Sequence, residues 1–217
     1  MTATLVGATG LIGSSLLEEL LNDPYFDTVR ILIRWPIDIA NAKLEKKIVD
    51  FNDSDSILVA LSNSDVVFCA IGSTMKKVKG DKDAYRKIDF EIPVNLARFC
   101  KMTGCEKYIL VSSAGANSKS SNFYQRLKGE TDEAVKEAGP KTVHIMRPSL
   151  LLGERKEFRL GENIGKAFMT SLSFLIPDKY KPIQGKDVAK IMLAFAKKKK
   201  EGFFIHENKE IRELAKK

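Results

Sequence analysis

The chain contains few of the residues that build disulfide frameworks and metal centres. Its 217 residues include three cysteines and two histidines. No Cys-x-x-Cys pair is present, and no cysteine lies at metal-ligand spacing from a histidine. The three cysteines, Cys69, Cys100 and Cys105, cannot all pair with one another. We therefore expect buried, reduced thiols, no metal site and a cytoplasmic location.

Long apolar runs are also missing. The longest, such as residues 57–61 and 66–71, have the length of a strand or a buried helix, whereas a bilayer-spanning helix needs roughly 20 apolar residues. Met1 and Thr2 run straight into an expected strand, which leaves no room for a basic region, a leader core and a cleavage site. We expect no export and no membrane partner.

The net charge of +8 raises the question of a polyanionic partner. The lysines are scattered, however, and the densest run, Lys197–Lys200, ends a helix-like segment, where cations favour the negative end of the helix dipole. Basic and aromatic residues do not interleave as they do in single-strand binders. We expect a solvated basic surface and no nucleic acid.

Hydrophobic residues make up 44% of the chain, which suits one compact domain over residues 1–217. Short apolar segments alternate with longer amphipathic ones, the pattern of βαβ units in a doubly wound, parallel α/β sheet with helices on both faces. The expected strands are 2–6, 28–34, 46–50, 65–71, 106–112, 142–147 and 203–206. The expected helices are 11–22, 54–62, 82–103, 121–138, 161–175 and 187–200, with a kink or early break at Pro93.

The segment GATGLIG occupies the first strand-to-helix turn of this pattern. Gly7 lets the chain leave the strand tightly, Gly10 lets a pyrophosphate approach the backbone, and Gly13 permits close packing of helix on strand. The amides that open the helix then face the anion. We expect the cofactor diphosphate to contact Gly7, Ala8, Thr9, Gly10, Leu11, Ile12 and Gly13.

Residues after the second and third strands bear on the choice of cofactor. The second strand ends in Arg34, and no acidic residue follows before Asp38. An arginine at this place meets a 2′-phosphate, so NADP(H) is favoured over NAD. Trp35 is placed to lie against the adenine or to cap the sheet edge. Asp50 and Phe51 either flank the adenine or form an ordinary turn. After the fourth strand, the residues that leave space for the ribose and diphosphate are Ala70, Ile71 and Gly72.

The segment YQRLK places Tyr124 and Lys128 on one helical face, because residues four apart are neighbours on a helix. With five tyrosines in a lysine-rich chain, such a pair also arises by chance, so its setting matters. It opens the helix after the fifth strand, whose end in VSSAGA puts Ser112 and Ser113 at the carboxyl edge of the sheet, where open α/β folds bind ligands.

Taken together, these motifs resemble the short-chain dehydrogenase/reductase superfamily. GATGLIG, DVVFCAIGST, YRKID, YILVSSAGANSKSSNFYQRLKGE and MRPSLLLGER are similar to its atypical branch, typified by the HIV Tat-interacting oxidoreductase-like proteins. The resemblance implies a Rossmann fold, NADP(H) binding and a catalytic site of Ser113, Tyr124 and Lys128. It ranks Ser113 ahead of Ser112, because Ser113 directly precedes the alanine that follows the equivalent hydroxyl in related enzymes. It also places Pro148, Ser149 and Leu150 beside the nicotinamide.

These residues suit reduction of a carbonyl group. Tyr124 would give a proton to the carbonyl oxygen, Lys128 would stabilise the phenolate and hold the ribose, and Ser113 would donate to the substrate oxygen. The expected partner is a small carbonyl substrate, bound by a small lobe from residues 151–186. The alternative is a regulatory module that senses NADP(H) or docks a protein with little turnover. A homodimer or an unidentified protein partner is compatible with both. His144 is expected in the core and His206 at the periphery.

Overall fold

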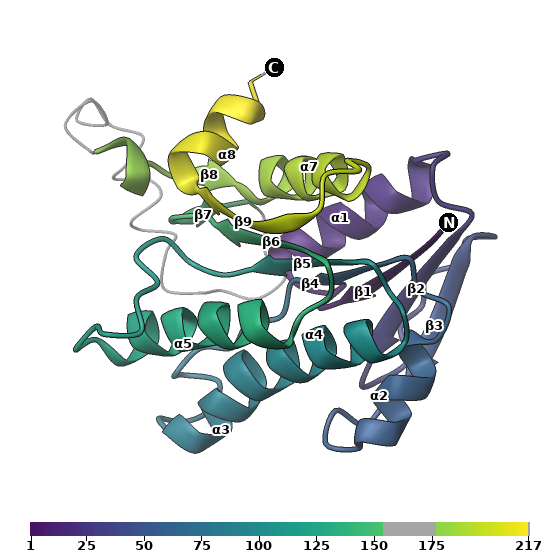
Figure 1. The fold of residues 1–217 in the computed structure, drawn as a ribbon, viewed down its shortest axis with the longest axis horizontal. Helices are drawn as coiled ribbons and strands as arrows, with labels where there is room; N and C mark the ends of the chain where they lie inside the picture. Colours follow the sequence, from purple (N-terminus) through teal and green to yellow (C-terminus); the bar gives the residue numbers. More distant parts are fainter. Residues whose placement is uncertain (154–176, 217) are drawn as a thin grey trace.

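The fold is a single sheet of seven parallel strands between two layers of helices (Figure 1). The computed structural model describes residues 1–153 and 177–216. The strand order is β3-β2-β1-β4-β5-β6-β9. The strands are β1 Thr2–Val6, β2 Thr28–Ile33, β3 Leu44–Ile48, β4 Val66–Cys69, β5 Lys107–Val111, β6 Thr142–Arg147 and β9 Gly202–Glu207. The expected doubly wound α/β class is confirmed, with the switch in strand order between β1 and β4.

Helices cover both faces of this sheet, as Figure 1 shows. α1 (Leu11–Asn22) packs against α7 (Gly185–Ala196) on one face, with α8 (Asn208–Leu214) nearby. The other face carries α2 (Ser54–Leu61), α3 (Lys82–Arg86), α4 (Ile92–Met102) and α5 (Phe123–Ala138). Alternate residues of the inner strand β1 contact the two layers: Leu5 belongs to the α1–α7 core and Val6 to the α2–α4–α5 core.

The edge strand β3 departs from the expected apolar strand pattern. Its sequence, LEKKI, is mostly exposed, and it pairs only with β2. The pairing places Glu45 opposite Arg30, and the two side chains form an ion pair at 2.9 Å. Charged side chains on an edge strand oppose pairing with other chains.

Pro93 breaks the long helix expected over residues 82–103. The chain runs as α3, a π-helical turn at Lys87–Glu91, and then α4. Within the π-turn, the Ile92 amide donates to the Lys87 carbonyl oxygen, five residues back. Proline has no amide hydrogen for the carbonyl four residues earlier and crowds it sterically, so the wider turn fits here.

Three elements near the carboxyl end were not expected from the sequence. β7 (Leu151–Leu152) and β8 (Ile183–Gln184) pair in a separate two-stranded sheet, and α8 follows β9 directly. These strands are two residues long and α8 has seven residues, which is too short for a clear periodic signal. The helix expected at 161–175 lies outside the described residues.

The two histidines form a buried pair between β6 and β9. His144 Nδ1 lies 2.9 Å from His206 Nε2, and both rings stack with Phe195 of α7. The core position expected for His144 is confirmed, whereas the peripheral position expected for His206 is wrong. Burial, and next the neighbouring His206, lower the pKa of His144 to about 3. His144 is therefore neutral at physiological pH and has a packing role.

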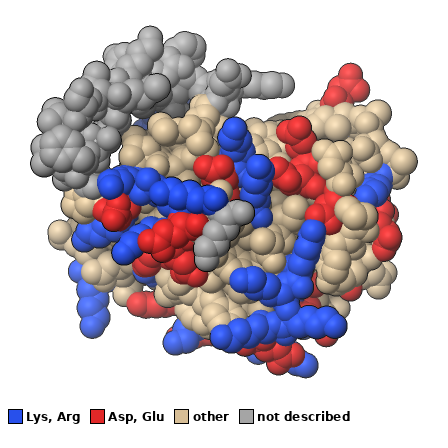
Figure 2. Space-filling view, turned by 90° about the horizontal axis from the view of Figure 1, so that it is seen from above, with Lys and Arg blue, Asp and Glu red and all other residues tan. Residues whose placement is uncertain are grey.

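Charge on the face that carries α1, α7 and α8 is mixed. Figure 2 shows Lys and Arg side chains interleaved there with Asp and Glu side chains. Within residues 1–153 and 177–216, no helix has both the length and the apolar character needed to cross a bilayer.

The β1–α1 turn is closed by contacts that only glycine permits. Gly7 has a φ of +91°, and a Cβ there would lie 2.7 Å from the Ala70 carbonyl oxygen. A Cβ on Gly13 would lie 2.0 Å from the Gly7 carbonyl oxygen, far inside the contact distance. The expected role of Gly13, close packing at the start of α1, is confirmed by this contact.

We predict that Gly13→Ala destabilises the protein although alanine favours helices, because the new methyl group collides with backbone that has no room to move. A loss of about 1 to 3 kcal/mol in unfolding free energy is expected. Urea denaturation followed by circular dichroism measures it. Gly72→Ala is the matched control, since its Cβ would meet only Asp89 Oδ1 at 3.7 Å. Equal stability of the two variants would contradict the prediction.

Candidate cofactor and active site

The diphosphate end of the candidate cofactor site is built by two adjacent turns. Gly10 is the N-cap of α1, and its amide donates to the Gly7 carbonyl oxygen at 3.0 Å. The second turn starts after β4, where the Ala70 amide donates to Val6 O at 2.9 Å. Gly7 and Ala70 thus bring residues 7–13 and 70–72 side by side. The free amides at the start of α1 and the positive end of its dipole suit an anion at this edge.

The adenosine end is a cavity of about 540 Å³. It brings together all four residues expected there, which are Arg34, Trp35, Asp50 and Phe51. The Trp35 side chain is exposed, with 75% of its surface accessible, so it does not pack as a core residue. Asp50 Oδ1 accepts from the Asn52 amide at 2.9 Å, which gives it a local turn role whether or not it also meets an adenine.

Other residues of this cavity were missed by sequence reasoning. They come from the end of β3, from the segment that leads into α2, and from the π-turn and α4. A second cation, Lys87, lies among them; it belongs to the YRKID segment, but nothing in that segment indicates a place beside Arg34. The additional lining residues are Ile48, Val49, Asn52, Ser54, Lys87, Ile88, Glu91, Ile92 and Asn95.

Tyr124 and Lys128 lie in the first turns of α5, as expected. The Asn122 side chain caps this helix by accepting from the Gln125 amide at 3.1 Å. The Lys128 Nζ atom lies 6.0 Å from the centre of the Tyr124 ring. Tyr124 is 40% exposed, whereas the Lys128 side chain is only 7% exposed. The pair therefore has an accessible phenol above a buried ammonium.

The partner of Lys128 is Asp89 of the π-turn, at 2.7 Å from Nζ. Burial opposes the charged form of Lys128, but the Asp89 carboxylate and then Tyr124 outweigh it, so the pKa of Lys128 is raised. Asp89 is 1% exposed and was not expected at the site. Two signals in the sequence point to it: it belongs to the YRKID segment, and Pro93 follows it by four residues.

The two candidate serines occupy different environments. Ser112 is buried, and its hydroxyl faces Asp132 of α5. Burial raises the pKa of Asp132, against the opposing effects of the Ser112 hydroxyl and Arg147. Ser113 is half-buried, and among the described residues its hydroxyl donates to the Ala114 carbonyl oxygen at 3.4 Å. Ser113 is thus the less buried of the two serines, and its rank ahead of Ser112 stays a prediction.

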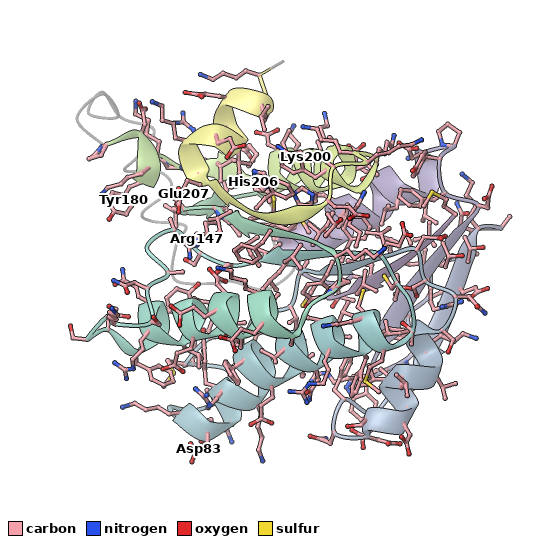
Figure 3. All side chains as sticks on the ribbon, in the orientation of Figure 1. Asp83, Arg147, Tyr180, Lys200, His206 and Glu207 are labelled. Atoms are coloured by element: carbon pink, nitrogen blue, oxygen red, sulfur yellow. The ribbon has the colours of Figure 1, made fainter. Side chains whose placement is uncertain are left out.

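Arg147 and Glu207 hold the end of β6 to β9 behind these serines. Arg147 pairs with Asp132 through Nη2 at 2.9 Å and with Glu207 through Nη1 at 3.0 Å. Figure 3 shows Arg147 and Glu207 on the neighbouring strands β6 and β9. This network fixes the position of α5 against the sheet and leaves Arg147 neutralised.

The segment after β6 is tied to both sides of the edge. The Ala114 amide donates to Pro148 O at 2.9 Å, and the Ser149 amide donates to Asn208 Oδ1 at 3.0 Å. The Ser149 hydroxyl donates to Lys181 O, which joins the β6 end to the segment before β8. Of the expected lobe at 151–186, residues 154–176 lie outside the described part of the chain.

No cluster of three or more potential metal ligands occurs within the described ranges 1–153 and 177–216. The donor set that the structure does present is one for an organic anion: backbone amides at the start of α1, Arg34 and Lys87 in the cavity, and an ammonium next to a phenol. These groups fit a dinucleotide with a diphosphate and two riboses.

Several solved structures share this fold. MoeE5 in complex with UDP-glucuronic acid and NAD gives a TM-score of 0.74 at 17% identity, over 94% of this chain and 75% of that one. A UDP-glucose 4-epimerase from Thermotoga maritima gives 0.73 at 16% identity, over 100% and 81%. At this identity the likeness shows the Rossmann-type fold alone.

Sequence relatives are closer. The family described as NAD(P)H-binding matches residues 7–199. "Protein FMP52, mitochondrial" of Candida albicans is 33% identical over 204 residues, 91% of this chain and 89% of the relative. "Protein HTATIP2" of Rattus norvegicus is 32% identical over 171 residues, 77% and 70%. The chain therefore belongs to the NAD(P)H-binding family, within the atypical short-chain dehydrogenase/reductase branch that contains these two proteins.

Proposed function

We propose that this protein is an NADP(H)-dependent oxidoreductase that reduces the carbonyl group of a small substrate. The observation that carries the proposal is the accessible Tyr124 phenol above the buried Lys128 ammonium, on one helical face at the carboxyl edge of the sheet. The turns at 7–13 and 70–72 lie at the same edge of the sheet as that pair. The cavity that contains Arg34 and Lys87 also lies at this edge.

When bound, the reduced nicotinamide supplies a hydride to the carbonyl carbon. Tyr124 gives its phenolic proton to the carbonyl oxygen in the same step, so that an alcohol is formed. Lys128 stabilises the phenolate left on Tyr124 and donates to the nicotinamide ribose. Ser113 donates a hydrogen bond to the carbonyl oxygen and fixes its orientation. Pro148, Ser149 and Leu150 border the nicotinamide.

The 2′-phosphate of NADP(H) is assigned to Arg34. We predict that NADPH binds more tightly than NADH, because the guanidinium forms charge-assisted hydrogen bonds to a group that NADH lacks. Arg34→Ala should weaken NADPH by roughly ten- to a hundredfold, the equivalent of about 1.5 to 3 kcal/mol, and leave NADH nearly unchanged. Titration calorimetry with both cofactors measures this.

Arg98→Ala is the control for the Arg34 variant, since Arg98 on α4 is an arginine outside the cavity lining. Equal affinity of the unmutated protein for NADPH and NADH would show that the assignment of Arg34 is wrong. Trp35 fluorescence should also change on binding, because the exposed indole is at the cavity wall.

A second candidate function is favoured by the Asp89–Lys128 ion pair. The carboxylate at 2.7 Å already offsets the charge of the ammonium, which leaves less of that charge to stabilise a phenolate. An NADP(H)-sensing or protein-docking module needs cofactor binding without this stabilisation. A homodimer or an unidentified protein partner fits such a module, and light scattering with and without NADPH tests for a change in mass.

Tyr124→Phe separates the two functions. Among the described residues the Tyr124 hydroxyl has no hydrogen bond that the variant would lose, so NADPH affinity and stability should change little. Hydride transfer, measured as NADPH oxidation with a substrate found in a panel of aldehydes, ketones and quinones, should fall by about 10² to 10⁴ in kcat.

Serine variants complete this comparison. Ser113→Ala should resemble Tyr124→Phe, while Ser112→Ala should be milder, because the Ser112 hydroxyl faces Asp132. Near-normal turnover by Tyr124→Phe would mean that Tyr124 is not the acid. Binding of NADPH with no oxidation of it against any member of the panel would favour the sensor.

The cytoplasmic location stays a prediction. It rests on three free, buried cysteines, whereas the FMP52 relatives are named as mitochondrial proteins. Fractionation of cells that express the full chain distinguishes the two compartments.

A further inference from the structure

Pro93 leaves the carbonyl group of Asp89 without its helical partner. In a continuous α-helix the amide of residue 93 would donate to the carbonyl of residue 89, but proline has no amide hydrogen. The Thr131 hydroxyl of α5 lies 3.1 Å from this carbonyl oxygen and takes the place of the amide. The same hydroxyl also lies 2.8 Å from Leu127 O, so the π-turn is bound directly to the helix that carries Lys128.

The side chain of Asp89 makes two further connections. Oδ1 lies 2.7 Å from Lys128 Nζ, and Oδ2 accepts from the Ser73 amide at 2.7 Å. Ser73 directly follows the turn at 70–72 that borders the candidate diphosphate site. Asp89 therefore joins three segments that are distant in sequence: the turn after β4, the π-turn and α5.

We propose that Asp89 is the positioning residue of the site: its carboxylate holds the Lys128 ammonium under Tyr124 and fixes it relative to the turn after β4. The proposal deepens the NADP(H) function proposed above and rests on it for the role of Lys128 toward the cofactor. Asp89 itself touches neither the substrate nor the cofactor in this assignment.

Electrostatics explains why this lysine needs a charged partner. Lys128 is buried, and burial alone favours the neutral amine. The first cause that acts in the opposite direction on its pKa is the Asp89 carboxylate. The other charged or titratable groups that act on Lys128 include Tyr124 and Asp132 of its own helix and Cys69 at the end of β4. The phenol and the thiol are not permanent anions at neutral pH, and Asp132 is paired with Arg147 at 2.9 Å. Asp89 is thus the carboxylate in direct contact with the amine, and we assign to it the charge that keeps Lys128 protonated.

Asp89→Asn is the variant that isolates this effect. Asparagine keeps the size of the side chain and an oxygen that can accept from the Ser73 amide, but it removes the charge. The pKa of Lys128 should then fall, by up to several units for a fully buried amine. A purely structural role of Asp89 in holding the turn after β4 would leave the protonation of Lys128 unchanged.

The test is a pH titration of the protein without cofactor by NMR, with ¹³C-labelled lysine. The Lys128 signal is identified by its absence in Lys128→Met. In the unmutated protein the signal should not titrate up to about pH 9, and in Asp89→Asn it should titrate below about pH 9. A Lys128 signal that stays in the charged form through this range in Asp89→Asn would overturn the proposal.

NADPH affinity provides the second readout. For Asp89→Asn it should be at least about tenfold weaker at pH 9 than at pH 6.5, because the neutral amine loses a charge-assisted hydrogen bond to the ribose. The unmutated protein should lack this extra loss. Asp83→Asn is the matched control, since Asp83 is an exposed aspartate at the outer end of the neighbouring helix α3 (Figure 3).

The two readouts separate this proposal from the proposed function. If the unmutated protein does not bind NADPH, the cofactor assignment fails, while the NMR titration still tests the hold of Asp89 on Lys128. If NADPH binds and Asp89→Asn shows the same affinity at both pH values as the Asp83→Asn control, the positioning role fails and the cofactor assignment stands.

A double-mutant cycle keeps the proposal testable if Asp89→Asn folds poorly. Removing one member of a buried ion pair leaves the other uncompensated, whereas removing both does not. The loss of melting temperature in the double variant Asp89→Asn, Lys128→Met should therefore be smaller than the sum of the losses in the two single variants. Additive losses in melting temperature would contradict a direct coupling of the two side chains.

Discussion

The arrangement of the carboxyl edge depends on one close contact, between the first turn of α1 and the turn that precedes it. A Cβ on Gly13 would lie 2.0 Å from the Gly7 carbonyl oxygen, and a Cβ on Gly7 would lie 2.7 Å from the Ala70 carbonyl oxygen. Because β1 pairs with β4 inside the sheet, these contacts fix α1 and the end of β4 at the same time. α1 then supports α7 on one face of the sheet. The same packing sets the position of the backbone amides at the start of α1, which suit a diphosphate.

A second constraint acts on the opposite face, where Pro93 interrupts the helical hydrogen bonds. The chain takes a π-turn there, and Asp89 within this turn is buried. The cost of the break is offset by the Thr131 hydroxyl on the Asp89 carbonyl and by Lys128 on its carboxylate. The π-turn thus carries the residue, Asp89, that contacts the proposed functional side chain of Lys128.

The sequence predicted those parts of the site that local spacing determines. The geometry of one turn determines the positions of the glycines at 7, 10 and 13, and the structure shows the close packing expected there. The geometry of one helix determines the spacing of Tyr124 and Lys128, which the structure also shows. Arg34, Trp35, Asp50 and Phe51 were grouped correctly because the ends of adjacent parallel strands share one edge. Their contacts with a cofactor remain proposals.

Residues that act across long sequence distances were not predicted. Asp89 meets Lys128 only after the π-turn and α5 pack together, and its place in the YRKID segment does not show which of the 36 basic residues it pairs with. His206 was placed at the periphery because the pairing of β9 with β6, which buries it against His144, cannot be read from either segment alone. Lys87, an exposed residue of the same π-turn, lines the candidate adenosine cavity with Arg34 only because these distant segments pack side by side.

The Asp89–Lys128 ion pair leaves less charge for a phenolate but holds the ammonium in both candidate functions, so Tyr124 is the residue that distinguishes them. A sensor of NADP(H) needs the buried ammonium for the ribose, and Asp89 would hold that ammonium in either case. It has no use for the phenol. Tyr124 is 40% exposed and belongs to neither hydrophobic core, so folding does not require an aromatic hydroxyl at this position. A proton donor above a fixed cation is what the proposed reduction requires and what a sensor does not, so the Tyr124 phenol is the part of the site that supports the proposed reductase.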